Sequence, residues 1–159
     1  MITKADCPFC HADIKRSVFA EEGQFWAIYN IAPILPGHSL VIPRGHVRSI
    51  MELSEEELGR FMTFARRVTK TVLEAFAASG FDWAIQDAEE AGQTVPHLHM
   101  HIIPRTPNDL PHEGDWYNKL EQSKAQAIDS KDRPNLAPDQ LDRYVCALRE
   151  AFDQAERSG

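Results

Sequence analysis

Apolar and polar residues alternate along the first part of the chain, which predicts β-strands there. Residues 18–20 and 25–29 are rich in apolar side chains and are separated by a turn at Glu22-Gly23, an order that predicts a β-hairpin. Prolines then break the chain into a loop, and residues 39–43 form a short apolar segment that a further proline ends. We therefore expect three strands before the first long helix.

The most regular apolar spacing predicts one long helix in the middle of the chain. Ser54 followed three residues later by Glu57 matches the capping box that begins many helices. Apolar residues then recur at helical spacing over residues 58–76, and Gly80 follows the last of them. A second helix is predicted near the C-terminus, over about residues 138–157.

Two more strands are predicted after the long helix. Residues 81–87 form one of them, and the alternation of apolar residues and histidines over 98–103 indicates the other. Strands interrupted by one long helix, without regular βαβ alternation, favour an α+β fold with an antiparallel sheet of about five strands. Prolines and charged residues over about 104–137 predict an irregular flap, and residues 1–159 are expected to form a single domain.

Composition and charge narrow the function classes. The chain has 159 residues, of which 43% are hydrophobic and 26% charged, typical of a globular domain with a core of its own. A formal net charge of −7 with no basic stripe argues against nucleic acid as a partner. No apolar run approaches the ~20 residues that span a bilayer, and the N-terminus does not resemble a signal peptide. With an odd number of cysteines, three, the expected location is the cytoplasm.

The run from His97 to His101 carries the strongest chemical signal. Strand geometry places His97, His99 and His101 on one face, with about 7 Å between successive Cα atoms. Spread over ~13 Å, they cannot all bind one metal without ligands from elsewhere. The amide of Gln93 and the hydroxyl of Thr94 come just before the run and suit phosphate oxygens. The pattern is therefore consistent with imidazole attack on phosphorus through a phosphoramidate intermediate. The alternative interpretations are a metal site and a surface strand whose histidines occur by chance.

Cys7 and Cys10 form a second candidate site with the spacing Cys-x-x-Cys. This spacing is typical of one half of a zinc knuckle, and a redox pair or two buried thiols are the alternatives. No βα unit follows, so the context of a thioredoxin-like pair is missing. A zinc site would need two further ligands. Cys146 lies at an apolar position of the last helix and is predicted to be part of the core.

Two segments resemble the signatures of a known family. Residues 85–105, which include His97-Leu98-His99-Met100-His101, resemble the active-site signature of the histidine-triad (HIT) superfamily. The ending Ile103-Pro104-Arg105 is most similar to the fragile-histidine-triad branch, the diadenosine polyphosphate hydrolases. Upstream, residues 29–43 resemble the second signature of the family. The likeness covers roughly residues 7–120 of the chain.

The resemblance implies a HIT-like fold and a role for each matching residue. His99 is implied to be the nucleophile that takes the nucleoside monophosphate, and His101 to contact the phosphate or the leaving-group oxygen. The other implied substrate-binding residues are Gln93 and Thr94 at phosphate oxygens, Gln86 near the α-phosphate, Asn30 at the ribose, and His38 beside the nucleophile.

The resemblance also implies a metal, a cofactor and an assembly. The fragile branch typically lacks the cysteine pair, but similar bacterial-type proteins and the galactose-1-phosphate uridylyltransferases bind structural zinc through it. In that pattern the four ligands are Cys7, Cys10, His46 and His97. Magnesium is expected to accompany the substrate polyphosphate, because no acidic cluster resembles a dedicated magnesium site. Similar proteins are homodimers, with the long helix and the triad sheet near the interface.

The leading expectation is an enzyme that cleaves dinucleoside polyphosphates through a nucleotidyl intermediate on His99. A nucleotidyltransferase or phosphorylase, or a nucleoside phosphoramidase, would use the same intermediate with another acceptor or leaving group. A non-catalytic nucleotide-binding or signalling module is the alternative of another class.

Overall fold

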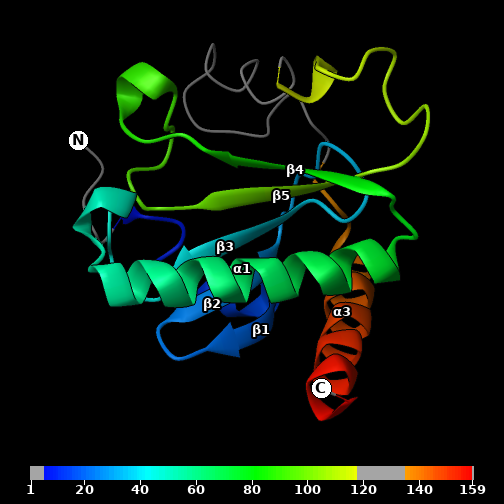
Figure 1. Ribbon diagram of the computed structural model, residues 1–159, viewed down its shortest axis with the longest axis horizontal. Coiled ribbons are helices and arrows are strands. Elements are labelled where there is room, and N and C mark those ends of the chain that lie inside the picture. Colours follow the sequence, from blue (N-terminus) through cyan, green and yellow to red (C-terminus); the bar gives the residue numbers. More distant parts are fainter. Residues whose placement is uncertain (1–5, 118–134, 159) are drawn as a thin grey trace.

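One antiparallel sheet and two long helices form the framework of the described chain (Figure 1). The structure is a computed structural model that describes residues 6–117 and 135–158. The strands are β1 (Val18–Glu22), β2 (Phe25–Tyr29), β3 (Ser39–Pro43), β4 (Gly80–Ile85) and β5 (Met100–Arg105), in the order β1-β2-β3-β5-β4. The helices are α1 (Glu55–Ala75) and α3 (Pro138–Ser158), and short 3-10 turns lie at Ala12–Ser17, Ile50–Glu52 and Glu89–Ala91. The predicted α+β fold with five strands is confirmed.

The long helix α1 begins where the sequence predicts. The Ser54 hydroxyl accepts the N–H of Glu57, and the Glu57 carboxylate accepts the N–H of Ser54 at 2.8 Å. This reciprocal pair satisfies two backbone donors that the first turn leaves without helical partners. One face of the helix is then fully buried, at Phe61, Phe64, Ala65, Val68 and Val72. α1 is therefore fixed against the sheet by its apolar stripe.

The two faces of the sheet carry different side chains. Leu98, Met100 and Ile102 join the main core with residues of α1 and α3. The opposite face carries a smaller apolar cluster of Ile28, Leu40 and Ile42, and it is on this side that the alternate residues of the histidine run point. The helices thus cover one face and leave the other for the candidate site.

The strand that carries the histidine run, β5, pairs differently along its length. Its pairing with β3 ends at Ile102, whereas its pairing with β4 continues through Pro104, opposite Phe81. A proline has no N–H to donate, so it is tolerated where only one neighbouring strand remains. The irregular flap begins after Arg105, and residues 118–134 of it lie outside the described residues.

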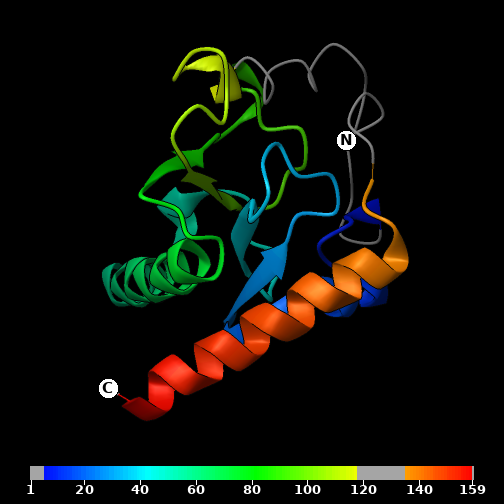
Figure 2. The same ribbon diagram turned by 90° about the vertical axis from the view of Figure 1, so that its right-hand side faces the viewer.

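The C-terminal helix α3 crosses the molecule diagonally beside β1 and α1 (Figure 2). Its buried residues are Leu141, Val145, Leu148 and Phe152, a spacing that follows one helical face. Cys146 comes one residue after Val145, about 100° around the helix, and is exposed. The prediction that Cys146 lies in the core is therefore wrong.

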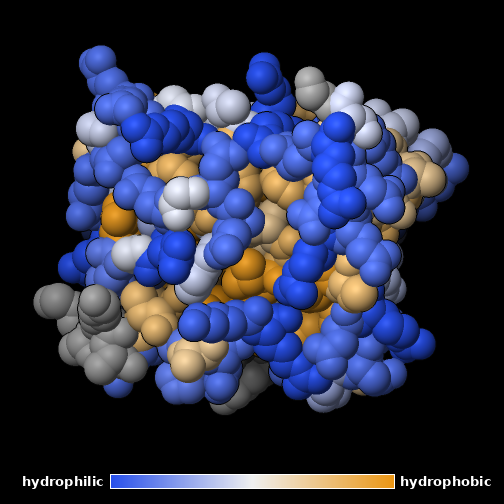
Figure 3. Space-filling view, turned by 90° about the horizontal axis from the view of Figure 1, so that it is seen from below, coloured by the Kyte–Doolittle hydropathy of each residue, from blue (hydrophilic) through white to orange (hydrophobic). Residues whose placement is uncertain are grey.

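A hollow of about 470 Å³ opens between β1 and α3, away from the histidine run. Its lining mixes apolar and charged residues: Lys15, Val18, Phe19, Ala20, Glu21, Trp26, Arg44, Arg149, Phe152 and Asp153. Seen from below, apolar side chains show in a depression between rows of hydrophilic ones (Figure 3). Within the described residues, no helix is both long and apolar enough to cross a membrane.

Gly37 gives a test of how tightly the fold holds the loop before β3. Its φ is +89°, and a Cβ there would lie 2.7 Å from Pro104 and 2.8 Å from Phe76. We expect Gly37→Ala to lower the free energy of unfolding by about 1–3 kcal/mol, measured by urea denaturation. Gly59 in α1 has nothing near its Cβ position, so Gly59→Ala should instead raise it by about 0.5–1 kcal/mol. Equal effects of the two variants would show that the loop accommodates a Cβ at Gly37 without strain.

Candidate active site and metal site

The first part of the histidine run is an extended segment that leads into β5. β5 begins at Met100, so His97 and His99 precede the regular strand. Between them, the N–H of Leu98 donates to the carbonyl of Val47 at 2.7 Å, and the Leu98 side chain is buried in the main core. This anchor fixes the alternation, so that the flanking histidines turn away from the helices.

His99 is held in one tautomer by the backbone. Its Nδ1 lies 2.7 Å from the carbonyl oxygen of His97. A carbonyl oxygen only accepts hydrogen bonds, so Nδ1 carries the proton and Nε2 keeps a lone pair. His99 is 5% exposed, and burial lowers its pKa, although the bond to the His97 carbonyl opposes that shift. The neutral form of the side chain therefore has its lone pair on Nε2.

His38 and His101 form a hydrogen-bonded pair beside His99. Nε2 of His38 lies 2.9 Å from Nδ1 of His101, and the N–H of Ile34 donates to Nδ1 of His38 at 3.2 Å. The proton of neutral His38 is therefore on Nε2 and is donated to His101, which leaves the proton of neutral His101 on its own Nε2. The His101 ring lies 5.0 Å from the His99 ring. The structure thus brings His38 against His101.

Asn30 joins the same network from the end of β2. Its amide nitrogen lies 3.5 Å from the ring nitrogens of His38, and its amide oxygen accepts the N–H of Ala32 at 3.0 Å. The amide group is therefore oriented by the loop that contains Ala32. Asn30 and His38, at the two ends of one loop, and His101, which is distant in the sequence, therefore form one continuous polar network.

His97 is fixed by a carbonyl on the other side of its ring. Its Nε2 donates to the carbonyl oxygen of Pro43 at 2.9 Å, so the lone pair of the neutral ring is on Nδ1. Burial lowers the pKa of His97 to about 4, with His46 and His99 adding smaller contributions in the same direction. A neutral imidazole that donates its one N–H to a carbonyl, with the lone pair on its other nitrogen, is the form in which histidine binds metals.

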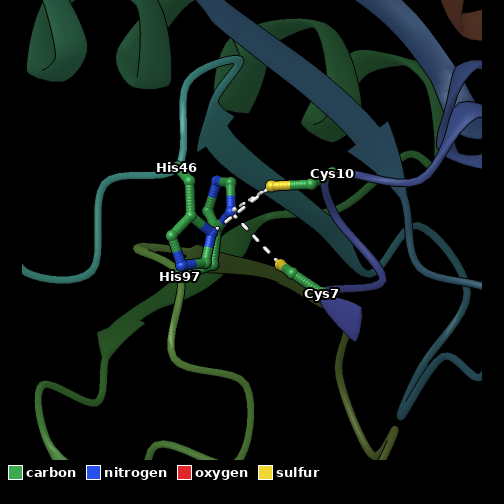
Figure 4. A group of neighbouring side chains, drawn as sticks. All are labelled: Cys7, Cys10, His46 and His97. Carbon is green, nitrogen blue, oxygen red and sulfur yellow. Dashed lines mark hydrogen bonds between the residues drawn. The ribbon is translucent and has the colours of Figure 1, made fainter. Parts of the chain in front are cut away.

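The structure brings Cys7, Cys10, His46 and His97 together (Figure 4). Their ligand atoms all lie within 4.8 Å of one another. Nδ1 of His97 is 3.5 Å from the Cys7 sulfur and 3.6 Å from the Cys10 sulfur, and Nδ1 of His46 is 3.3 Å from the Cys10 sulfur. A tetrahedral zinc ion with ordinary Zn–S and Zn–N bonds separates a sulfur from a nitrogen by about 3.5 Å. The four side chains therefore fit this metal.

The loop before the histidine run holds the remaining predicted residues. The Gln93 amide nitrogen donates to the carbonyl of Arg48 at 2.8 Å, and its oxygen accepts the N–H of Ala88 at 3.1 Å. Thr94 is half-buried. The amide nitrogen of Gln86, just after β4, is buried and has no hydrogen-bond partner among the described residues. A buried amide donor in that state is suited to an acceptor on a ligand.

Phe9 is a residue of this site that the sequence reasoning missed. It lies between the two cysteines, and its ring centroid is 5.5 Å from that of His97 and 5.4 Å from that of His99. It also packs against the apolar cluster of Ile28, Leu40 and Ile42. An aromatic residue inside the Cys-x-x-Cys segment was the available signal, but the sequence alone does not show what its ring touches.

Comparison with known proteins finds relatives of this chain both by sequence and by fold. The family model described as HIT domain matches residues 11–108, a range that contains Asn30, His38 and the histidine run but not the cysteine pair. The chain is similar to the bis(5'-adenosyl)-triphosphatase of Dictyostelium discoideum, at 35% identity over 129 residues, which is 81% of this chain and 80% of that protein.

Two further similarities extend the comparison. The asymmetrical bis(5'-nucleosyl)-tetraphosphatase of Schizosaccharomyces pombe is 43% identical over 98 residues, which is 62% of this chain and 54% of that protein. Among solved structures, a hypothetical histidine triad nucleotide-binding protein from Sulfolobus tokodaii matches with a TM-score of 0.74 and 26% identity, over 95% of each chain.

The tautomer of His99 is a direct prediction of this geometry. In nitrogen-15 NMR spectra of the imidazole rings, we expect neutral His99 to carry its proton on Nδ1 and to be less protonated at pH 6 than a histidine in a flexible peptide, because burial lowers its pKa. At that pH a histidine in a flexible peptide, with a pKa of about 6.5, is mostly protonated. A His99→Asn variant assigns the signals. A proton found on Nε2, or a ring that titrates like the peptide, would contradict the assignment.

Proposed function

The chain belongs to the HIT domain family, and from this premise we propose that it hydrolyses dinucleoside polyphosphates of the diadenosine polyphosphate type. The similarity to a bis(5'-adenosyl)-triphosphatase and to an asymmetrical bis(5'-nucleosyl)-tetraphosphatase supports this substrate class. The observation that carries the proposal is the hydrogen bond from His99 Nδ1 to the carbonyl of His97, because it leaves Nε2 ready to attack.

The proposed first step is attack on phosphorus. Nε2 of His99 forms a bond to the α-phosphorus, and the bond from that phosphorus to the bridging oxygen breaks, so that the rest of the substrate leaves as a phosphate anion. As this bond forms, the imidazole gains positive charge. The carbonyl of His97 accepts from Nδ1 and stabilises that charge without having to move, which is where preorganised dipoles help most.

His101 supports the leaving group in this scheme. The bond from His38 leaves the proton of His101 on Nε2, where it donates to the leaving oxygen or to a nonbridging phosphate oxygen. In the second step a water molecule attacks the phosphorus and the P–N bond breaks. The electron pair returns to Nε2 of His99, one proton passes to solvent, and the nucleoside monophosphate is released.

The surrounding residues are proposed to hold the phosphates and the nucleoside. The unpartnered amide of Gln86 suits an α-phosphate oxygen, and the hydroxyl of Thr94 suits a neighbouring one. Gln93 is proposed to contribute to binding the same oxygens. Its side-chain amide is hydrogen-bonded to Ala88 and Arg48 and so stabilises the loop. Asn30 is proposed to bind the ribose. Magnesium is proposed to enter with the polyphosphate, which supplies most of its oxygen ligands.

We propose that Cys7, Cys10, His46 and His97 bind a structural zinc ion. Two thiolates and two imidazoles are a donor set that zinc prefers, and their spacing fits a tetrahedron. When bound, the ion supplies a crosslink between the N-terminal segment, the loop after β3 and the histidine run. The four protein ligands would then fill the coordination positions of a tetrahedral ion and leave none for the substrate, so we assign the ion a structural role.

We also propose that the chain acts as a homodimer. The edge strand β4 has only β5 as a partner in the described chain, and Phe81 on it is 45% exposed. Leu58 near the start of α1 is 37% exposed. Open strand edges and exposed apolar side chains are typical of surfaces that pair with another subunit.

Two substitutions test the proposed chemistry. His99→Gln should lower kcat/KM for diadenosine triphosphate by about 10⁴-fold, because it removes the nucleophile. His101→Gln should lower it by about 10²–10³-fold, the effect of losing one hydrogen-bond donor to the reacting phosphate. Chromatography of the nucleotide products measures both. A His99→Gln enzyme within tenfold of the wild type would contradict the assignment.

The acceptor is tested with isotope-labelled water. In water enriched in oxygen-18, hydrolysis places one label in the released monophosphate, with or without inorganic phosphate present. With diadenosine triphosphate, hydrolysis gives one AMP and one ADP, whereas two ADP and no AMP in the presence of added phosphate would identify a phosphorylase.

The metal proposal has its own test. We expect one zinc per chain by metal analysis, and we expect Cys7→Ser to lose the metal and to lower Tm by at least about 5 °C. Cys146→Ser, at the exposed cysteine of α3, is the matched control and should change neither quantity. Purified protein that contains no zinc and whose Tm does not respond to added zinc would contradict the proposal.

A further inference from the structure

Phe9 links the two candidate sites. Its ring lies edge-on to His97, with 82° between the ring planes, and is tilted by 57° against His99. One of these partners is a proposed zinc ligand, and the other is the proposed nucleophile. Phe9 therefore touches both sites at once, although neither the metal binding nor the attack on phosphorus requires an aromatic side chain at this position.

The backbone around Phe9 is shaped by the two cysteines. The N–H of Cys10 donates to the carbonyl of Cys7 at 3.0 Å, which closes a tight turn with Phe9 inside it. The two sulfur atoms tie this turn to the imidazoles of His97 and His46. Without metal, those ties are thiol–imidazole contacts, and thiols are weak hydrogen-bond partners. With metal, the two cysteine sulfurs at the ends of the turn are bonded to an ion that His46 and His97 also hold.

The orientation of the His99 ring needs more than one contact. Its hydrogen bond to the His97 carbonyl restrains rotation about the Cβ–Cγ bond through one atom, Nδ1. One hydrogen bond still allows small coupled rotations about Cα–Cβ and Cβ–Cγ, and groups that pack against the ring limit them. Among the described residues, the rings of Phe9 and His101 lie against it, and of these two Phe9 comes from the metal-binding turn.

We infer that Phe9 is a positioning residue through which occupancy of the metal site sets the orientation of the nucleophilic His99 ring. The inference rests on the proposed function of His99 and on the proposed zinc site. With the metal bound, the turn holds Phe9 against His99 and keeps Nε2 aimed at the phosphate. When the metal is lost, the turn loosens, Phe9 withdraws, and His99 samples unproductive orientations. Metal content thereby becomes a control on turnover.

The test compares wild type, Phe9→Leu and Phe152→Leu, each loaded with zinc and after chelation. Phe152 is a buried ring on α3 that contacts Phe64 and Arg67 in the core on the helix-covered face of the sheet, so it controls for general loss of packing. Three quantities are measured: zinc per chain, the His99 imidazole resonances, and kcat. The resonances report on the ring whether or not the protein turns over any substrate.

In wild type and in Phe152→Leu, chelation should shift the His99 resonances and lower kcat by about tenfold. Zinc-loaded Phe9→Leu should still hold one zinc per chain, but its His99 resonances and kcat should already resemble those of the chelated wild type. Chelation should then change its kcat less than about twofold. Phe9→Tyr keeps the ring and should restore the wild-type response, which also serves if the leucine variant folds poorly.

Three results would overturn the inference. The first is that chelation leaves the His99 resonances of the wild type in place, and the second is that chelation affects Phe9→Leu as strongly as the wild type. The third is a protein that binds no zinc, which would remove both the metal site and the coupling. None of these results bears on the assignment of His99 as the nucleophile, because the loss of activity in His99→Gln tests that assignment separately.

Discussion

A single backbone carbonyl, that of His97, decides what the histidine run does. By accepting a hydrogen bond from Nδ1 of His99, it leaves the lone pair of the neutral ring on Nε2, and in the reaction we propose it stabilises the charge of a nucleotidyl-imidazole. The carbonyl can do this only if the His97 backbone is fixed. The ring of His97 achieves that, since its Nε2 donates to Pro43 and its Nδ1 faces the two cysteine sulfurs.

The same constraint explains how four histidines are buried in one small site. A buried charge is costly, so each ring is most stable as a neutral imidazole with its hydrogen bonds satisfied. Backbone groups and the pair between His38 and His101 supply those bonds. The opposite face of the segment stabilises the arrangement, because Leu98, Met100 and Ile102 are buried against the helices and set the alternation.

Much of this architecture follows from local sequence signals. The capping box at Ser54 and Glu57, the hairpin of β1 and β2 and the alternation at β5 predict their elements, because each depends on neighbouring residues. The family resemblance implied that Cys7, His46 and His97 share one metal site, and the structure places them together. Other contacts depend on residues far apart in the chain: the Pro43 carbonyl that sets the His97 tautomer, and the position of Phe9 against His97 and His99. The Ile34 N–H that orients His38 depends on the shape of the loop between β2 and β3, which the sequence pattern does not give. The error at Cys146 has the same origin, since helical spacing alone does not show where the buried stripe of α3 ends. The sequence therefore predicts which residue types form the candidate site, but it predicts only part of how they are arranged.

Mapping the covalent intermediate tests the central claim, that His99 is the nucleophile, most directly. Enzyme mixed with diadenosine triphosphate is quenched within one turnover and digested, and the peptides are sequenced by mass spectrometry under conditions that preserve phosphoramidates. We expect adenylate on His99, with none on His97 or His101. Adenylate on another residue, or its absence while substrate is consumed, would contradict the claim.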